Sequence, residues 1–267
     1  MTWIFLNKNN SDEYIEMFAH GSGAVPTCLE TWQYEDSTDP LVLRGIMKHK
    51  IIKRCWQDNR DFYYMDTGYM GNRPGPNNPN GWKFWHRVVP NNLQHDAVIS
   101  RPADRWQRLG IAMRPEQKHS RNILLVAPDQ KPCSFYGITL DEWMQTTIET
   151  LKQHTDRPIL VRERPASRWD RKTQRAEEWL ADVHAVVTFN SSAATECILA
   201  GVPVFVTAPA NAARPMSNLD LSKIETPWFP TDDERHAWAC HLAYGQFHTT
   251  ELADGTAARI LKETEHV

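Results

Sequence analysis

A small polar turn follows an apolar run in the second half of the chain. Asn190, Ser191 and Ser192 come directly after the strand-like run HAVVTF and before a short apolar stretch that predicts a helix. Small side chains, hydroxyl groups and free amide N–H groups at a helix N-terminus suit a phosphate or pyrophosphate, because the missing bulk lets the anion approach the backbone. Plain N-capping, in which Ser191 or Ser192 only satisfies unpaired amides, explains the same residues. The turn therefore predicts either a diphosphate site or a helix cap.

A single carboxylate, Glu196, stands in the predicted helix after this turn. It follows Ser192 by four residues, so both side chains project from one helix face. A carboxylate placed there can accept the two hydroxyls of a ribose. A surface glutamate on a solvated helix face is the alternative, and the flanking apolar residues of ECILAG disfavour it.

These residues need a sheet edge to position them, and the second half of the chain predicts one. Strands are expected at 122–128, 158–165, 184–190 and 202–209, alternating with helices at 139–155, 171–183 and 192–201. Thr139 and Glu142 have the spacing of a capping box, and Gly201 is placed to end the last helix. The alternation predicts a parallel, Rossmann-like sheet, whose ligands lie beyond the carboxyl ends of the strands.

The first half of the chain has less regular patterning. Its expected elements are a strand at 2–7, a capped helix at 11–24, a strand or short helix at 40–46, a strand at 61–71 running into a glycine turn, a loop at 72–81 and an aromatic strand at 82–90. Two further helices are expected near 232–244 and 249–263.

The predicted class is α/β, with two lobes. The polar stretch RPEQKHSR marks the expected boundary between them. We predict an N-terminal acceptor-side lobe at 1–118, a Rossmann-like lobe with flanking helices at 119–230, and C-terminal helices at 231–267 that pack back towards the first lobe.

Composition indicates a globular, non-membrane protein. Of the 267 residues, 41% are hydrophobic and 24% charged, and no apolar run approaches the roughly 20 residues that span a bilayer. The N-terminus has no basic region before its apolar run, so it is predicted to be a strand and not a signal peptide. The five scattered cysteines, without a CxxC pair, indicate unpaired thiols in a reducing cytoplasm and argue against structural zinc.

Three segments are locally basic, although the net charge is −3. They are Lys48–Arg54, Arg101–Arg108 and Arg162–Lys172. A solvated helix face is the ordinary explanation of each, and a surface facing phosphate or nucleic acid is the alternative. The total charge itself gives no attraction to nucleic acid.

The segment SSAATECILAGVPV resembles the sugar-nucleotide-binding segment of GT-B glycosyltransferases and related nucleotide-sugar epimerases. In that family a small-residue turn meets the diphosphate, a glutamate holds the ribose, and a G-x-P turn, here Gly201-Val202-Pro203, starts the next strand. The resemblance covers about 122–206 and is nearest to capsule-polysaccharide-type transferases and small phage-encoded sugar transferases. The segments MDTGYMG…WHRVVPN and ERHAWACHLAYGQFHTTELADG also resemble the phage proteins, some of which modify hydroxymethylated bases in phage DNA.

The resemblance implies further donor-binding residues. Arg162 and Arg164 end a predicted strand and suit bidentate phosphate binding, or else a surface ion pair with Glu163 or Asp170. Arg214 lies in the small-residue stretch APANAARPMSN, which suits a mobile loop over the donor or an ordinary surface loop.

The resemblance also implies a catalytic base on the acceptor side. Asp66 is the first candidate, because an apolar strand delivers it to a glycine turn; an Asx-turn to the amides of Gly68 or Tyr69 is the alternative. His20 is the second candidate, and a glycine cap at a helix end explains its surroundings equally well. The remaining acceptor-side candidates are Gly21, Gly23, Tyr69, His86 and Arg87, for the last two of which packing is the alternative.

The predicted function is transfer of a sugar from a nucleotide-sugar to a hydroxyl acceptor. The resemblance to phage proteins names a hydroxymethylated base in double-stranded phage DNA as a candidate acceptor, in the host cytoplasm. No DxD motif is present, and TDDE predicts a helix cap, so the reaction is expected to use no metal and no cofactor beyond the nucleotide-sugar. The alternatives are a capsule or lipopolysaccharide sugar transferase, a nucleotide-sugar epimerase or hydrolase, and a non-catalytic nucleotide- or nucleic-acid-binding module.

Overall fold

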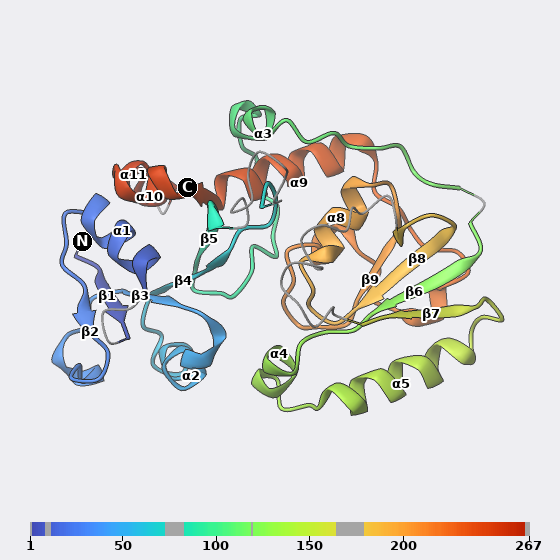
Figure 1. Cartoon of the computed structure of the whole chain (residues 1–267), viewed down its shortest axis with the longest axis horizontal. Coiled ribbons are helices and arrows are strands. Elements are labelled where there is room, and N and C mark those ends of the chain that lie inside the picture. Colours follow the sequence, from blue (N-terminus) through green and yellow to red (C-terminus); the bar gives the residue numbers. More distant parts are fainter. Residues whose placement is uncertain (1, 9–11, 73–82, 119, 164–178, 265–267) are drawn as a thin grey trace. The chain divides into compact units, whose positions relative to one another are not determined.

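The computed structural model describes residues 2–8, 12–72, 83–118, 120–163 and 179–264 (Figure 1). Contacts divide the chain into two compact units. Unit 1 comprises Met1–Asn72, Asn80–Leu93 and Ala243–Val267, and unit 2 comprises Arg73–Pro79 and Gln94–Leu242. The long range of unit 2 thus begins after Leu93 and ends at Leu242, whereas the sequence prediction places its lobe boundaries at 118 and 230.

Unit 1 contains a six-stranded sheet with the order β10-β5-β4-β3-β1-β2. The strands are β1 (Ile4–Asn7), β2 (Thr27–Cys28), β3 (Leu41–Arg44), β4 (Phe62–Thr67), β5 (Trp85–Pro90) and β10 (Gln246–His248). Strands β1 to β4 pair in parallel, while β5 pairs antiparallel with both β4 and β10. The sequence did not predict β10, because three residues are too few to show an alternating pattern.

The helices of unit 1 include α1 (Glu13–Gly21), α2 (His49–Asp58), α10 (Thr249–Ala253) and α11 (Thr256–Thr264). Asp12 caps α1 by accepting hydrogen bonds from the amides of Tyr14 and Ile15. Buried side chains of α1, including Phe18, pack against Phe5 of β1, with ring centroids 5.2 Å apart. This packing fixes α1 against the sheet.

Gly21 explains how closely α1 approaches α10. A Cβ atom at this position would overlap the backbone carbonyl of Leu252. Gly23 has a φ of +73° and open space around it, so its backbone conformation and not crowding favours glycine. Both glycines therefore belong to the end of α1 and its packing.

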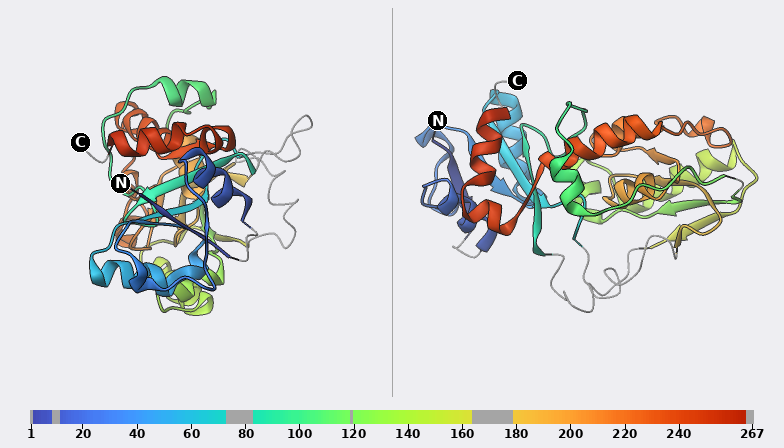
Figure 2. Two further views of the ribbon diagram at one scale, coloured as in Figure 1. Left: turned by 90° about the vertical axis from the view of Figure 1, so that its left-hand side faces the viewer. Right: turned by 90° about the horizontal axis from the view of Figure 1, so that it is seen from above.

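Unit 2 contains a four-stranded parallel sheet with the order β7-β6-β8-β9. The strands are β6 (Asn122–Val126), β7 (Ile159–Arg162), β8 (Val183–Thr188) and β9 (Val204–Val206). The helices include α3 (Asp104–Leu109), α4 (Gln130–Phe135), α5 (Leu140–Lys152), α8 (Ala193–Leu199) and most of α9 (Asp232–Tyr244), as Figures 1 and 2 show. The predicted α/β class and the parallel sheet of the second half are confirmed.

Two predicted helix starts are also confirmed. Thr139 and Glu142 form the reciprocal hydrogen bonds of a capping box at α5. Thr231 and Glu234 do the same at the start of α9, so TDDE is a helix cap. Most of the helix predicted at 171–183 lies outside the described residues.

Candidate functional sites

Each sheet has a place where the strand order reverses, and ligands of open α/β sheets bind outside the carboxyl ends of the strands at such a place. In unit 1 the reversal falls between β1 and β3, since β2 lies on one side of β1 and β3 on the other. In unit 2 it falls between β6 and β8, since β7 follows on one side and β8 and β9 on the other. The two sheet edges are therefore separate candidate sites.

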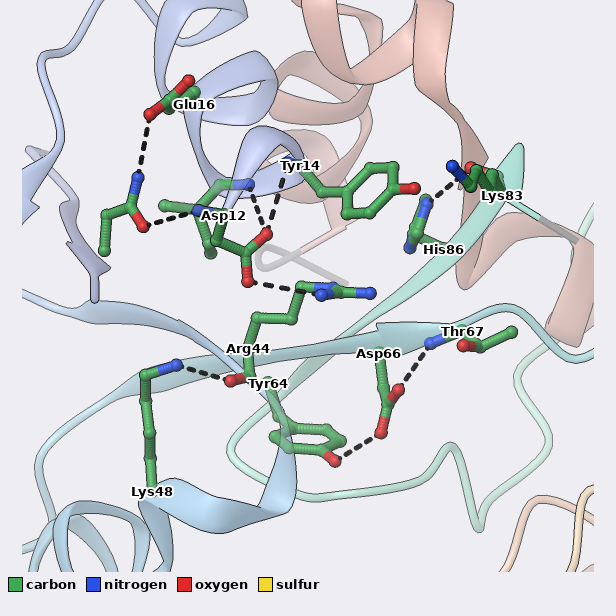
Figure 3. A network of polar contacts seen from close by, with 12 residues as sticks. Asp12, Tyr14, Glu16, Arg44, Lys48, Tyr64, Asp66, Thr67, Lys83 and His86 are labelled. Carbon is green, nitrogen blue, oxygen red and sulfur yellow. Dashed lines mark hydrogen bonds and ion pairs between the residues drawn. The ribbon is translucent and has the colours of Figure 1, made fainter. Parts of the chain in front are cut away.

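The unit 1 edge carries polar residues from three parallel strands. Asn7 ends β1, Arg44 ends β3, and Asp66 is next to last in β4. Figure 3 shows Arg44 and Asp66 together with Asp12 and Tyr14 of the α1 start and His86 of β5. The sequence singled out Asp66 and His86, but it missed Asn7, Asp12 and Arg44. We call this set of residues the unit 1 cluster.

Asn7 joins the end of β1 to the start of α1. Its side-chain oxygen accepts a hydrogen bond from the Asp12 amide at 3.0 Å, and its amide group donates to the Glu16 carboxylate at 3.2 Å. Asn7 is fully buried, so its side chain depends on these two hydrogen bonds. The position of the helix cap Asp12 is thereby fixed.

Arg44 is held between a carboxylate and an aromatic ring. Its Nη1 lies 3.3 Å from Asp12 Oδ2, and its guanidinium carbon lies 4.6 Å from the centroid of the Tyr14 ring. The Tyr14 ring in turn packs on the His86 ring, with centroids 4.0 Å apart. Arg44 is thus oriented by an ion pair and a cation–π contact.

Asp66 lies directly opposite Arg87 in the β4–β5 ladder. One carboxylate oxygen accepts from the Tyr64 hydroxyl at 2.7 Å and lies 3.4 Å from Arg87 Nη2, and the other accepts from the Thr67 amide at 2.8 Å. Burial alone would raise the pKa of Asp66, but Arg87 and these hydrogen bonds outweigh it and hold the pKa below its usual range. The side chain is 35% exposed, so Asp66 is an ionised carboxylate that a ligand can reach.

The Asx-turn alternative for Asp66 is not formed. The Gly68 amide donates to the Trp85 carbonyl, and the Tyr69 amide donates to the Gln246 side chain. Neither amide is therefore bonded to Asp66.

Two other acceptor-side candidates, Arg87 and His86, are buried in β5, the strand beside Asp66. Arg87 is buried and also donates to the Thr67 carbonyl at 2.6 Å, and its guanidinium lies 5.4 Å from the centroid of the buried Tyr69 ring. His86 bonds the Lys83 carbonyl through Nε2, and burial lowers its pKa to about 4, so the ring is neutral near pH 7.

His20, Gly21 and Gly23 are not brought to this edge. They lie at the carboxyl end of α1, whereas Asp12 lies at its amino end. His20 is exposed there. The structure therefore separates the two candidate bases by the length of the helix.

The unit 2 edge carries the predicted donor turn. The Ser191 hydroxyl accepts from the Ala193 amide at 3.2 Å, whereas Ser192 is exposed and makes no side-chain cap bond. Asn190 is half-buried beside them, and Asn211 donates to the Ser191 carbonyl at 3.5 Å. Ser191 thus has the capping role that the sequence left open, while Ser192 does not.

Arg162 and Glu196 approach the same sheet edge from different elements. Arg162 ends β7 and lies 4.4 Å from the centroid of the Trp179 ring. Burial lowers the pKa of Arg162, and the charge of the half-buried Glu196 opposes this shift. Arg214 donates to the Ala208 carbonyl at 3.2 Å, in the segment after β9. Arg164 lies outside the described residues.

Three aromatic side chains also lie near this edge, and the sequence did not single them out. Phe189 follows β8 and contacts the rings of Tyr136 and Trp143, with centroids 5.6 Å and 6.1 Å away. The Trp143 indole donates to the Thr207 hydroxyl at 2.7 Å. A tryptophan on an amphipathic helix gives no sign of such a partner, because helix periodicity alone identifies it as core.

Metal and membrane features are absent from the part of the chain that the structure describes. No group of three or more His, Cys, Asp or Glu side chains there could hold a metal ion. Within the same residues, no helix has the length and apolar character needed to span a bilayer.

Comparisons with known proteins give structural neighbours only. No protein-family model and no curated protein matches the sequence. Two similar solved structures are from Thermosulfurimonas dismutans KpsC. The β Kdo 2,4 transferase has a TM-score of 0.47 and 11% identity, covering 89% of this chain and 98% of that chain. The β Kdo 2,7 transferase has a TM-score of 0.43 and 10% identity, covering 96% and 99%. A likeness at this level does not by itself establish an activity.

Proposed function

We propose that this chain is a glycosyltransferase of the GT-B type, which moves a sugar from a nucleotide-sugar to a hydroxyl acceptor. The observation that carries the proposal is the Asp66 carboxylate at the unit 1 edge. It is held by Tyr64, Thr67 and Arg87 and is still 35% exposed. An oriented, ionised carboxylate at a sheet edge has the form of a general base.

The donor site is proposed at the unit 2 edge. The diphosphate would lie against the exposed Ser192 and the start of α8, with Glu196 accepting the ribose hydroxyls. Arg162, at the end of β7, and Arg214, in the 3-10 helix that follows β9, would supply positive charge. The support is that Ser192 and Glu196 follow β8 and that Arg162 ends β7, so these three residues lie at the carboxyl side of the parallel sheet.

The proposed reaction needs one proton acceptor and stabilisation of one leaving group. The acceptor hydroxyl gives its proton to Asp66, its oxygen forms the bond to the sugar carbon, and the bond from that carbon to the nucleotide phosphate breaks. The low pKa of Asp66 makes it a weak base, so proton transfer would accompany the formation of the new bond and not precede it. Arginines and backbone dipoles, without a metal, would stabilise the departing phosphate.

The test is incubation of the protein with a panel of nucleotide-sugars, with and without hydroxyl acceptors. Release of nucleotide only with an acceptor supports transfer. Release without an acceptor indicates a hydrolase, and binding without turnover indicates a binding module; either would reject the proposal.

Asp66→Asn should lower kcat by at least about 100-fold while nucleotide affinity is unchanged. EDTA should leave the rate unchanged.

The sequence resemblance also proposes a specific acceptor, a hydroxymethylated base in double-stranded phage DNA. The locally basic segments support it, and the net charge of −3 opposes it. A gel-shift titration with duplex DNA at low salt tests this acceptor. Absence of binding at micromolar protein would reject it and leave sugar transfer to other hydroxyls intact.

A further inference from the structure

Three cations lie at the unit 1 edge: Arg44 of the unit 1 cluster and its neighbours Lys48 and Arg87. Lys48 ends the short 3-10 helix after β3 and interacts electrostatically with both Asp12 and Arg44. Arg44 pairs with Asp12 and Arg87 pairs with Asp66, whereas the half-buried Lys48 bonds a backbone carbonyl. His86 adds no charge near pH 7, because burial keeps it neutral. The edge therefore joins two ion pairs to a half-buried ammonium group.

Arg44 and Lys48 hold hydrogen-bond donors that the protein does not use. Arg44 Nε is buried without an acceptor in the described part of the chain, and of the guanidinium nitrogens only Nη1 pairs with Asp12. Lys48 donates to the Arg44 carbonyl at 2.6 Å, which is a neutral acceptor, and an ammonium has three protons to donate. Among the described residues, no carboxylate accepts a hydrogen bond from Lys48.

Arg44 also stands across from the candidate base. Its charge contributes to the low pKa of Asp66, although Arg44 pairs with Asp12 and not with Asp66. In Figure 3 the Arg44 guanidinium lies between the Tyr14 ring and the Asp66 carboxylate. A ligand whose hydroxyl meets Asp66 would therefore have its neighbouring group close to Arg44.

We propose that the unit 1 cluster binds an acceptor whose reacting hydroxyl lies close to an acidic group, a carboxylate or a phosphate, and that Arg44 and Lys48 bind this group. The inference rests on the proposed transferase function, since it names the class of acceptor for the same site. Guanidinium groups bind both kinds of acid through paired hydrogen bonds.

The burial of the cations favours a small acidic sugar over a nucleic-acid backbone. The Arg44 side chain is only 26% exposed and lies at the end of a strand in the interior of the edge. Proteins that follow a phosphodiester backbone use exposed cations along a surface. A single acidic group that enters the edge matches the observed placement better.

The proposal is tested by calorimetric binding without any nucleotide-sugar. The probes are glucuronate, glucose 6-phosphate and glucose, so the arms separate a carboxylate, a phosphate and no acid. At least one acid should bind about tenfold or more tightly than glucose. Arg44→Gln and Lys48→Gln should each remove this preference. The matched control is Arg54→Gln, because Arg54 is exposed on α2 and pairs with Glu35 and Asp58.

Equal binding of the three probes, or an acid preference that survives both variants, would overturn the inference. If Arg44→Gln fails to fold, as circular dichroism would show, Lys48→Gln decides the outcome alone. If acids bind through these residues but no nucleotide-sugar gives transfer, the proposed transferase function is rejected and the acid-binding site stands. If neutral and acidic sugars are acceptors with equal kcat/KM, the acid-binding role of Arg44 and Lys48 is rejected and the proposed transferase function stands.

Discussion

Replacing Tyr64 by Phe should raise the pKa of Asp66. The change removes the hydroxyl that donates to the carboxylate at 2.7 Å, while the ring, which is 2% exposed, keeps its packing. A hydrogen bond to a charged group contributes about 1.5–3 kcal/mol. Since Asp66 is 35% exposed, solvent screening reduces this to about 1 kcal/mol. The ionised form of the carboxyl group loses this stabilisation, so we expect the pKa of Asp66 to rise.

The same change should destabilise the protein in a pH-dependent way. A carboxyl group whose pKa is lowered in the folded state stabilises that state above its unfolded pKa of about 3.9, and this contribution disappears as the pH falls through the folded pKa. Tyr64→Phe should therefore cost about 1 kcal/mol of unfolding free energy near pH 7, with a difference that shrinks in acid.

NMR titration of the Asp66 carboxyl carbon measures the first effect, and urea unfolding at several pH values measures the second. Tyr34→Phe is the matched control, because its hydroxyl bonds the Cys55 thiol in the same unit and not a carboxylate. If Asp66 titrates at the same pH in the wild type and in Tyr64→Phe, the proposed role of the Tyr64 hydroxyl is refuted.

Three further changes test other parts of the structure. Asn7→Ala should lower the free energy of unfolding by about 1–2 kcal/mol, because the fully buried side chain loses its hydrogen bond with the Asp12 amide; urea unfolding measures this, and a loss below about 0.5 kcal/mol would contradict it. Gly21→Ala should lower the free energy of unfolding by several times the roughly 1 kcal/mol expected for Gly23→Ala. The added methyl group at position 21 overlaps the Leu252 carbonyl, whereas at position 23 only the positive φ disfavours alanine; equal losses would argue against crowding at Gly21. Glu196→Ala should weaken nucleotide binding about tenfold, and unchanged affinity in a calorimetric titration would remove Glu196 from the donor site.

The features that local patterning determines were predicted from the sequence. The Thr139 capping box, the TDDE cap and the alternation of strands and helices after residue 122 depend on residues close together in the chain. Asp66 was predicted as a candidate because its strand runs directly into a glycine turn. These signals need no knowledge of which strands are neighbours.

The unit 1 cluster depends on strand order, which local patterning does not contain. Arg44 meets Asp12, 32 positions earlier, only because β3 lies beside β1. Lys48 was assigned to a basic segment with the properties of a solvated helix face, whereas it is half-buried against the Arg44 carbonyl. The contact between Arg44 and Asp12 could not be inferred before the order β4-β3-β1-β2 was known, whereas that of Lys48 with the Arg44 carbonyl joins residues four positions apart.

The division of the chain between the two units has a consequence for biosynthesis. Apart from Arg73–Pro79, unit 2 is drawn from the single range Gln94–Leu242, whereas unit 1 also needs Ala243–Val267, which supply β10 and the helices packed on α1. On the ribosome, unit 2 can therefore complete its sheet while unit 1 still lacks an edge strand and the cover of its first helix. The N-terminal strands, although made first, can therefore complete their sheet only after the last residues of the chain have been made.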